Sequence, residues 1–154
     1  MIFVTLGTQD KAFGRLLEMI EKSNIQDEII VQSGYTKFTS SKMKIFDYLD
    51  INEFNSYMEK ADIIIGHGGV GTLLKAVELG KKVIAVPRLK KYGEHTNDHQ
   101  LQICDVLSKE GYVITLNDGD SLDDTYKQIK EFVPKPYTSN NLNFVSKLKE
   151  YLEL

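Results

Sequence analysis

Short apolar segments alternate along this chain with longer segments in which apolar residues recur every three or four positions. A short apolar run bounded by glycine or polar residues is typical of a buried strand, and the longer spacing is typical of an amphipathic helix. The strands expected on this basis are 2–7, 28–34, 44–49, 61–67, 82–87 and 112–116. The helices expected are 11–23, 52–61, 70–80, 98–111, 121–132 and 139–154.

Several of the expected helices carry further local signals. In the first helix, the apolar positions that follow the i, i+3, i+4, i+7 spacing are Phe13, Leu16, Leu17 and Ile20. Gly80 is placed to end the third helix, because glycine readily adopts the left-handed conformation found at helix C-termini. Ser121 is placed to cap the start of the fifth, with Asp124 as the acid of a capping box.

The alternation of strands and helices continues over the whole length of the chain. This order predicts a parallel sheet with helices on both faces, joined by right-handed crossovers. A length of 154 residues suits one such domain, so we expect a single Rossmann-like α/β domain over 1–154. Ligands of such folds bind beyond the carboxyl ends of the strands, which directs attention to the loops after Leu6, Ile65 and Val86.

Composition excludes several classes of function. The net charge of −3 and the absence of a basic stripe with interleaved aromatics give no sign of nucleic-acid binding. The N-terminus has no signal-peptide pattern, and no segment approaches the roughly 20 apolar residues that span a bilayer. We therefore expect any membrane association to come through the protein's surface or through a partner. Cys104 is the single cysteine, and its apolar helical setting predicts a buried structural thiol.

The loop LGTQD follows the first expected strand and leads into a helix. Gly7 permits a tight turn, and Thr8 or Asp10 is placed to cap the helix. Exposed N–H groups and the positive end of a helix dipole together make an anion site. A plain connection between strand and helix explains the same residues.

The segment GHGGVGT at 66–72 is the second glycine loop, and four of its seven residues are glycine. It has neither the GxGxxG spacing of dinucleotide-binding folds nor the Lys-Ser/Thr pair of a P-loop. What remains is a glycine-lined helix N-terminus that can approach a phosphate or a sugar closely. His67 either donates a hydrogen bond to a ligand oxygen or anchors the turn, and the spacing leaves both open.

The segment EHTNDHQ at 94–100 is the third candidate, at the expected start of a helix. Asp98 and Gln100 have side chains suited to vicinal sugar hydroxyls. His95 and His99 are four residues apart, which suits a metal pair on one helical face. No third ligand is evident and His95 precedes the helix, so we expect no metal site.

Taken together, these segments resemble a known family. ADIIIGHGGVGTLLKAVELGKKVIAVPR, followed by EHTNDHQLQ and preceded by the opening FVTLGTQ, looks like the donor-binding half of GT-B glycosyltransferases, the family 28 C-terminal domain. The likeness is strongest to the small subunits of two-part transferases, from eukaryotic dolichol-linked oligosaccharide synthesis and from bacterial capsule and exopolysaccharide synthesis. It covers nearly the whole chain and is least distinctive after Asp120.

The resemblance implies roles for particular residues. The residues it places at the donor diphosphate are Gly7, Thr8, Gly68, Gly69, Gly71 and Thr72. His67 stands in the same loop and is the candidate catalytic residue of this chain. The residues it places at the donor sugar are Asp98, His99 and Gln100. One departure is Lys75, since relatives often carry there a glutamate that binds the ribose, and Glu78 lies one turn further on.

The resemblance further implies the UDP-sugar-binding subunit of a two-component inverting glycosyltransferase, which extends a lipid-linked saccharide in bacterial capsular or exopolysaccharide synthesis. The UDP-sugar is its substrate, and no cofactor or metal is expected. A membrane-anchored partner subunit would bind the lipid-linked acceptor, supply the general base and hold this chain at the cytoplasmic face of the membrane. The segment 139–154 is either a docking element for that partner or an ordinary helix that closes the sheet.

Two alternatives remain open from the sequence. In the first, the chain acts alone on UDP-sugars, and the purified protein turns them over without a partner. In the second, the chain is a non-catalytic module that stabilises a partner, and it does not bind UDP.

Overall fold

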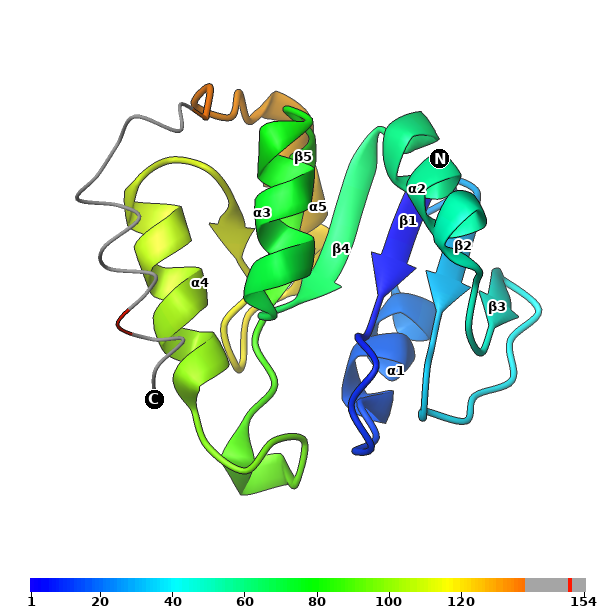
Figure 1. The fold of residues 1–154 in the computed structure, drawn as a ribbon. Coiled ribbons are helices and arrows are strands. Elements are labelled where there is room, and N and C mark those ends of the chain that lie inside the picture. Colours follow the sequence, from blue (N-terminus) through cyan, green and yellow to red (C-terminus); the bar gives the residue numbers. More distant parts are fainter. Residues whose placement is uncertain (138–149, 151–154) are drawn as a thin grey trace.

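The computed structural model describes residues 1–137 and Glu150, so the helix expected over 139–154 lies outside the described residues apart from that position. The strands are β1 (Ile2–Thr5), β2 (Ile29–Gln32), β3 (Met43–Phe46), β4 (Ile63–His67), β5 (Lys82–Val86) and β6 (Ile114–Thr115). The helices are α1 (Gly14–Lys22), α2 (Ile51–Lys60), α3 (Val70–Glu78), η1 (Lys90–Tyr92), α4 (His99–Lys109) and α5 (Leu122–Glu131), shown in Figure 1.

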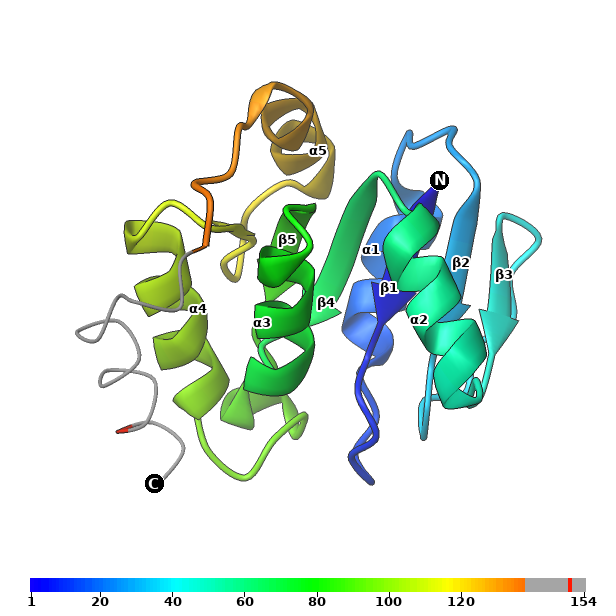
Figure 2. The same cartoon turned by 45° about the horizontal axis from the view of Figure 1, so that its top comes forward.

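All six strands are parallel and form one sheet in the order β3-β2-β1-β4-β5-β6. Figure 2 shows the strand arrows running the same way. The expected α/β fold with a parallel sheet is therefore confirmed. A parallel sheet requires crossover connections, and helices provide them except between β2 and β3, which residues 33–42 join without a helix.

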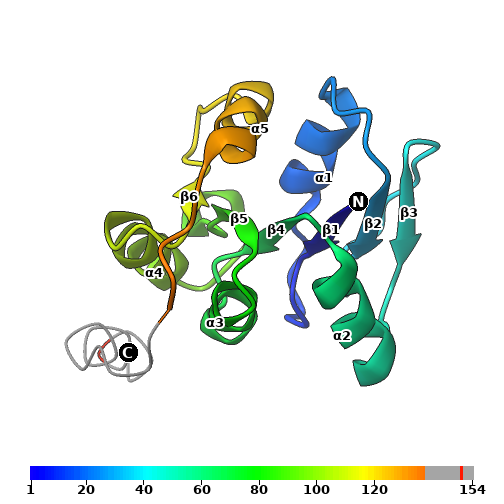
Figure 3. The same cartoon turned by 90° about the horizontal axis from the view of Figure 1, so that it is seen from above.

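Helices cover both faces of the sheet. Seen from above in Figure 3, α1 and α5 lie on one face, and α2, α3 and α4 lie on the other. Two apolar cores result: one includes Leu17 of α1 and Ile129 of α5, and the other includes Leu73 of α3 and Leu107 of α4. Because both faces are covered, every residue of β1 and β4 is buried, which explains their continuous apolar runs.

The strand order reverses between β1 and β4. From β1 the chain moves outward to β2 and β3, then returns to place β4 on the other side of β1. Such a reversal opens a crevice at the carboxyl ends of the two adjacent strands. Thr5 pairs with Gly66 across this boundary, so the two glycine loops begin side by side.

The ends of the elements confirm some predictions and correct others. Gly80 has a φ of +71°, and the Ser121 side chain accepts a hydrogen bond from the Asp124 N–H, as expected. The expectation that Thr8 or Asp10 caps the first helix is wrong, because α1 begins later, at Gly14. Thr36 Oγ1 instead accepts a hydrogen bond at 2.8 Å from the N–H of Phe13, the residue before this helix. The turn after β1 is therefore a loop of its own rather than a helix start.

We expect Phe3→Ala to destabilise the domain by about 3–5 kcal/mol, because it leaves a cavity in the core. Phe3 is fully buried, and its ring packs edge-on against Phe54 and is stacked on Tyr57. Urea unfolding of the two proteins measures the loss. Val133→Ala is the control, since Val133 is 85% exposed and its truncation should change stability by less than about 0.5 kcal/mol. Equal effects of the two substitutions would contradict the packing described here.

Candidate functional site

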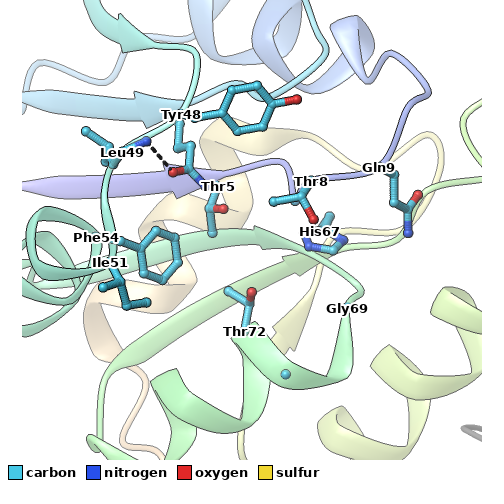
Figure 4. Close-up of a pocket in the computed structure, with 13 residues that line it drawn as sticks. Thr5, Thr8, Gln9, Tyr48, Leu49, Ile51, Phe54, His67, Gly69 and Thr72 are labelled. Atoms are coloured by element: carbon cyan, nitrogen blue, oxygen red, sulfur yellow. Dashed lines mark hydrogen bonds between the residues drawn. The ribbon is translucent and has the colours of Figure 1, made fainter.

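A pocket of about 450 Å³ lies at the carboxyl ends of β1, β2 and β4, at the point where the strand order reverses (Figure 4). Both glycine loops contribute to it, and so does the segment that joins β3 to α2. The residues that line it are Thr5, Gly7, Thr8, Gln9, Gln32, Tyr48, Leu49, Ile51, Phe54, His67, Gly69, Gly71 and Thr72. The two bends that the sequence singled out thus face one cavity.

The N-terminus of α3 forms one wall of the pocket. Gly69 is its N-cap and has no side-chain capping bond, and Gly71 and Thr72 of its first turn line the cavity. The first N–H groups of a helix have no acceptor within the helix, and they carry the positive end of its dipole. This wall therefore favours an anion such as a phosphate.

The imidazole of His67 lies between the two glycine loops. A Cβ added to Gly7 would come within 2.6 Å of His67 Nε2, and one added to Gly69 would come within 2.2 Å of His67 Cε1. Gly7 also has a φ of +82°, which favours glycine. These two glycines are therefore required by the close approach of the histidine ring as well as by chain turning.

Gly68 has a different role from its neighbours. It does not line the pocket, and a Cβ at this position would lie 2.6 Å from Gln100 Cβ and 2.9 Å from Gln100 O. Its lack of a side chain lets β4 pack directly against α4. The predicted contact of Gly68 with the donor diphosphate therefore has no support in the pocket geometry. Gly7, Thr8, Gly69, Gly71 and Thr72 all line the pocket, and their contact with a diphosphate stays a prediction.

Gln100 is buried at the start of α4, with 4% of its surface exposed, and it does not line the pocket either. Its Oε1 accepts hydrogen bonds from the N–H groups of Gly68 and Arg88, each at 3.0 Å. Its Nε2 lies 3.2 Å from His67 Nδ1. Gln100 thus reaches the site through His67, and the expected direct contact with a donor sugar is not favoured by this arrangement.

His67 is uncharged at neutral pH. Burial lowers its pKa to about 4, and the positive charge of Arg88 acts in the same direction. Only 6% of the residue is exposed, although its ring forms part of the pocket. A neutral imidazole offers one N–H donor and one acceptor, so His67 can donate to a ligand oxygen without bringing a charge.

A buried polar network holds the loop after β1 in place. The Arg88 guanidinium donates to the carbonyl oxygens of Leu6 and Lys11, at 2.5 and 2.7 Å, and lies over the Phe13 ring. Burial lowers the pKa of Arg88 to about 10, which leaves it charged at neutral pH. Because Arg88 follows β5, its contacts tie the first glycine bend to the loop between β5 and α4.

Glu94 completes this network. Its carboxylate forms a two-pronged ion pair with Arg15 of α1, at 2.9 and 3.0 Å, and also accepts the Leu89 N–H. Glu94 is only 3% exposed. The ion pair is partly buried, since the Arg15 side chain is 22% exposed, and removal of Arg15 would leave the buried Glu94 carboxylate without its counter-charge.

Asp98 and His99 lie at the same edge of the sheet but do not line the pocket. Asp98 Oδ1 accepts the Lys90 N–H at 3.0 Å, which ties it to η1. Their predicted contact with a donor sugar stays a prediction. Within residues 1–137 and position 150, no group of three or more His, Cys, Asp or Glu residues is placed to hold a metal ion.

The apolar side of the pocket was missed by sequence reasoning. Leu49, Ile51 and Phe54 form this side, and Gln32 at the end of β2 accepts the Leu49 N–H at 2.9 Å (Figure 4). The sequence signal that could have revealed it is Gln32, the polar residue that ends the apolar run of β2. It becomes meaningful only once β2 is known to neighbour β1.

Lys75, where the resemblance implies a ribose-binding glutamate, contacts α2. Its Nζ donates to Asn55 Oδ1 of α2 and lies 6.0 Å from the centre of the Phe54 ring. Lys75 therefore supports the apolar wall of the pocket from behind and does not line the cavity itself.

The family described as "Glycosyltransferase family 28 C-terminal domain" matches residues 1–153. The chain belongs to this family. Within the part of this family 28 domain that the structure describes, no helix is long and apolar enough to cross a membrane.

The family 28 domain is similar to curated proteins named UDP-N-acetylglucosamine transferase subunit ALG13. It is 29% identical to the one from Candida albicans over 80% of this chain and 36% of that protein. It is 27% identical to the one from Debaryomyces hansenii over 87% of this chain and 61% of that protein. It is 28% identical to the human one over 73% of this chain and 10% of that protein. The chain thus spans between a tenth and three fifths of these relatives.

Solved structures share the fold. An NMR structure of ALG13 matches with a TM-score of 0.65 at 18% identity, covering 99% of this chain and 96% of that one. The calicheamicin glycosyltransferase CalG4 matches with a TM-score of 0.60 at 12% identity, covering 99% and 38%. Acinetobacter baumannii MurG matches with a TM-score of 0.57 at 15% identity, covering 96% of this chain and 44% of that one. These neighbours are GT-B glycosyltransferase domains, so the chain has the fold of one half of a GT-B enzyme.

We expect Gly69→Ala to destabilise the domain by about 1–3 kcal/mol, because its Cβ would overlap the His67 ring. Gly71→Ala is the matched control, since nothing lies within 4 Å of a Cβ there and alanine favours the helix by about 0.5–1 kcal/mol. Urea unfolding of both variants gives the two values. The interpretation is wrong if Gly69→Ala is as stable as Gly71→Ala.

We also expect His67 to make stability depend on pH. Its pKa is about 4 in the folded domain and near 6.5 when unfolded, so the unfolded chain binds more protons between these values. The contribution of His67 to the free energy of unfolding is therefore complete above about pH 6.5. It decreases toward pH 4, by up to about 1.4 kcal/mol per pH unit.

Urea unfolding of the native domain and of His67→Gln between pH 4 and 7 isolates this contribution. The variant keeps every other titrating group, so the difference in slope belongs to His67. Parallel pH dependences for the two proteins would show that burial does not hold His67 neutral.

Proposed function

We propose that this chain binds a UDP-sugar at the switch-point pocket and supplies the donor side of a glycosyltransferase. The observation that carries the proposal is that the N-terminus of α3, the bend at Gly7 and the neutral His67 converge on one cavity. A diphosphate suits this set of donors because it offers several anionic oxygens to N–H groups that lack protein acceptors.

The opposite side of the cavity suits the base of the nucleotide. Leu49, Ile51 and Phe54 present apolar surface there, and the flat ring of a uracil can pack against it. The name of the ALG13 relatives favours N-acetylglucosamine as the transferred sugar. Asp98 and His99 lie at the same edge of the sheet and are proposed to contact it.

The proposed reaction is sugar transfer with inversion. The acceptor hydroxyl attacks the anomeric carbon, the bond from that carbon to the phosphate oxygen breaks, and UDP leaves with the electron pair. Negative charge then grows on the diphosphate, where the α3 N-terminus and the N–H of His67 stabilise it. The proton of the acceptor hydroxyl passes to a base that we assign to the partner subunit.

We further propose that the active enzyme contains a second subunit, which binds the acceptor. The ALG13 relatives are named as transferase subunits, and the chain covers only 38% of CalG4. The rim of the pocket is apolar and open, with Tyr48 59% exposed and Ile51 66% exposed. A partner that closes this rim would exclude water from the reacting atoms. We propose that this partner is membrane-anchored and holds the chain at the cytoplasmic face.

The lipid-linked acceptor and the pathway belong to the same proposal. The relatives described above come from fungi and human, and nothing in them favours capsular or exopolysaccharide synthesis over another pathway. A role in bacterial polysaccharide synthesis therefore stays a prediction, supported only by the resemblance of the sequence.

The proposal predicts that a carboxylate placed at the α3 N-terminus weakens UDP binding at least tenfold. Gly71→Glu introduces it within the pocket, at a position with open space around its Cβ, where it repels the diphosphate. Isothermal titration calorimetry with UDP measures the affinity.

Gly14→Glu is the matched control for this experiment. Gly14 also stands in the first turn of a helix with open space around its Cβ, but it does not line the pocket. The Gly14→Glu variant should bind UDP with the same affinity as the native chain. Failure of the native chain to bind UDP at millimolar concentration, alone and with its partner, would refute the proposal.

A further inference from the structure

The contacts of Gln100 determine the orientation of its side-chain amide. The atom that faces the Gly68 and Arg88 amides receives two N–H groups, each at 3.0 Å. Only an oxygen can accept both, so this atom is Oε1. The opposite orientation would direct an NH₂ group at two other donors in a buried position.

This orientation in turn determines the tautomer of His67. The Gln100 atom that lies 3.2 Å from His67 Nδ1 is then the amide nitrogen, which is a donor. Nδ1 must accept this hydrogen bond and cannot carry a proton. Because the ring is neutral, its proton resides on Nε2.

The Nε2–H group is on the side of the ring that faces the first glycine bend. Nε2 is the nearest atom to a Cβ built on Gly7, at 2.6 Å, and Figure 4 shows the ring beside Thr8 at the pocket. With Nε2 protonated, the histidine adds one more donor to the N–H groups of α3. With the proton on Nδ1, a lone pair would face the same space and repel a phosphate oxygen.

We propose that Gln100 is a positioning residue that holds His67 in the Nε2–H tautomer, so that the ring presents a hydrogen-bond donor to the pocket. Gln100 itself does not line the pocket. The tautomer follows from the contacts of the free protein, and only its use toward a diphosphate rests on the proposed function. The arrangement differs from a direct contact between Gln100 and the donor sugar.

Gln100→Glu is the substitution that tests this. The carboxylate keeps one oxygen for the Gly68 and Arg88 amides but presents a second oxygen to His67 Nδ1. An oxygen there accepts a hydrogen bond, so Nδ1 must now carry a proton. Long-range ¹H–¹⁵N NMR of the ligand-free protein at pH 7.5 reports which ring nitrogen is protonated, and loss of signals in His67→Gln assigns them.

The native protein should show His67 protonated on Nε2 alone, and Gln100→Glu should show it protonated on Nδ1. Gln102→Glu is the matched control: the same change on the same helix, at an exposed position, should leave His67 as in the native protein. A native His67 protonated on Nδ1, or an unchanged tautomer in Gln100→Glu, would overturn the proposal. The native spectrum decides by itself if Gln100→Glu does not fold.

UDP binding separates this proposal from a direct sugar contact. UDP carries no sugar, so a sugar-binding Gln100 predicts equal UDP affinity for the native protein and for Gln100→Leu, which adds no charge beside the pocket. Positioning of His67 predicts a lower affinity in Gln100→Leu, because nothing then donates to Nδ1, and an unchanged affinity in Gln102→Leu. If the native chain shows the Nε2–H tautomer yet binds no UDP, the proposed function fails while the assignment of Gln100 stands.

Discussion

A histidine ring held between two glycine backbones is the contact on which the rest of this site depends. His67 ends β4, and its imidazole occupies the space where side chains at Gly7 and Gly69 would otherwise lie. The ring therefore connects the bend after β1 to the N-terminus of α3. Burial at this junction also keeps it neutral, so it adds a donor to an anion-binding wall without adding a charge that would need its own partner.

Charged groups that do not line the pocket also support the site. Arg88 is buried behind the first glycine bend, bonded to two of its carbonyl oxygens, and it helps to keep His67 neutral. Glu94 and Arg15 anchor the neighbouring loop through a partly buried ion pair. Rigid supports of this kind hold donors in place before a ligand arrives, which reduces the cost of ordering them on binding.

Much of the fold and part of the site could be predicted from the sequence. Alternating periodicities gave the sheet-and-helix order, and glycines at strand ends pointed to Gly7, Gly69 and Gly71 around one pocket. Gly68 and Gln100 show where such reasoning ends. Both belong to the recognisable motifs, yet they pack the end of β4 against α4. The sequence does not distinguish a glycine that makes room for a helix from one that makes room for a ligand.

The sequence by itself determined the local elements and the residue types at their ends, because hydrophobic periodicity and glycine turns depend on neighbours along the chain. Only the tertiary structure decided that β2 lies beside β1 and so brings Gln32 and the apolar wall of Phe54 to the pocket. It also decided that Gln100 bonds Nδ1 of His67 and that Nε2 faces the bend at Gly7. Strand order and hydrogen-bond direction depend on contacts between residues far apart in sequence, such as the 33 positions that separate Gln100 from His67.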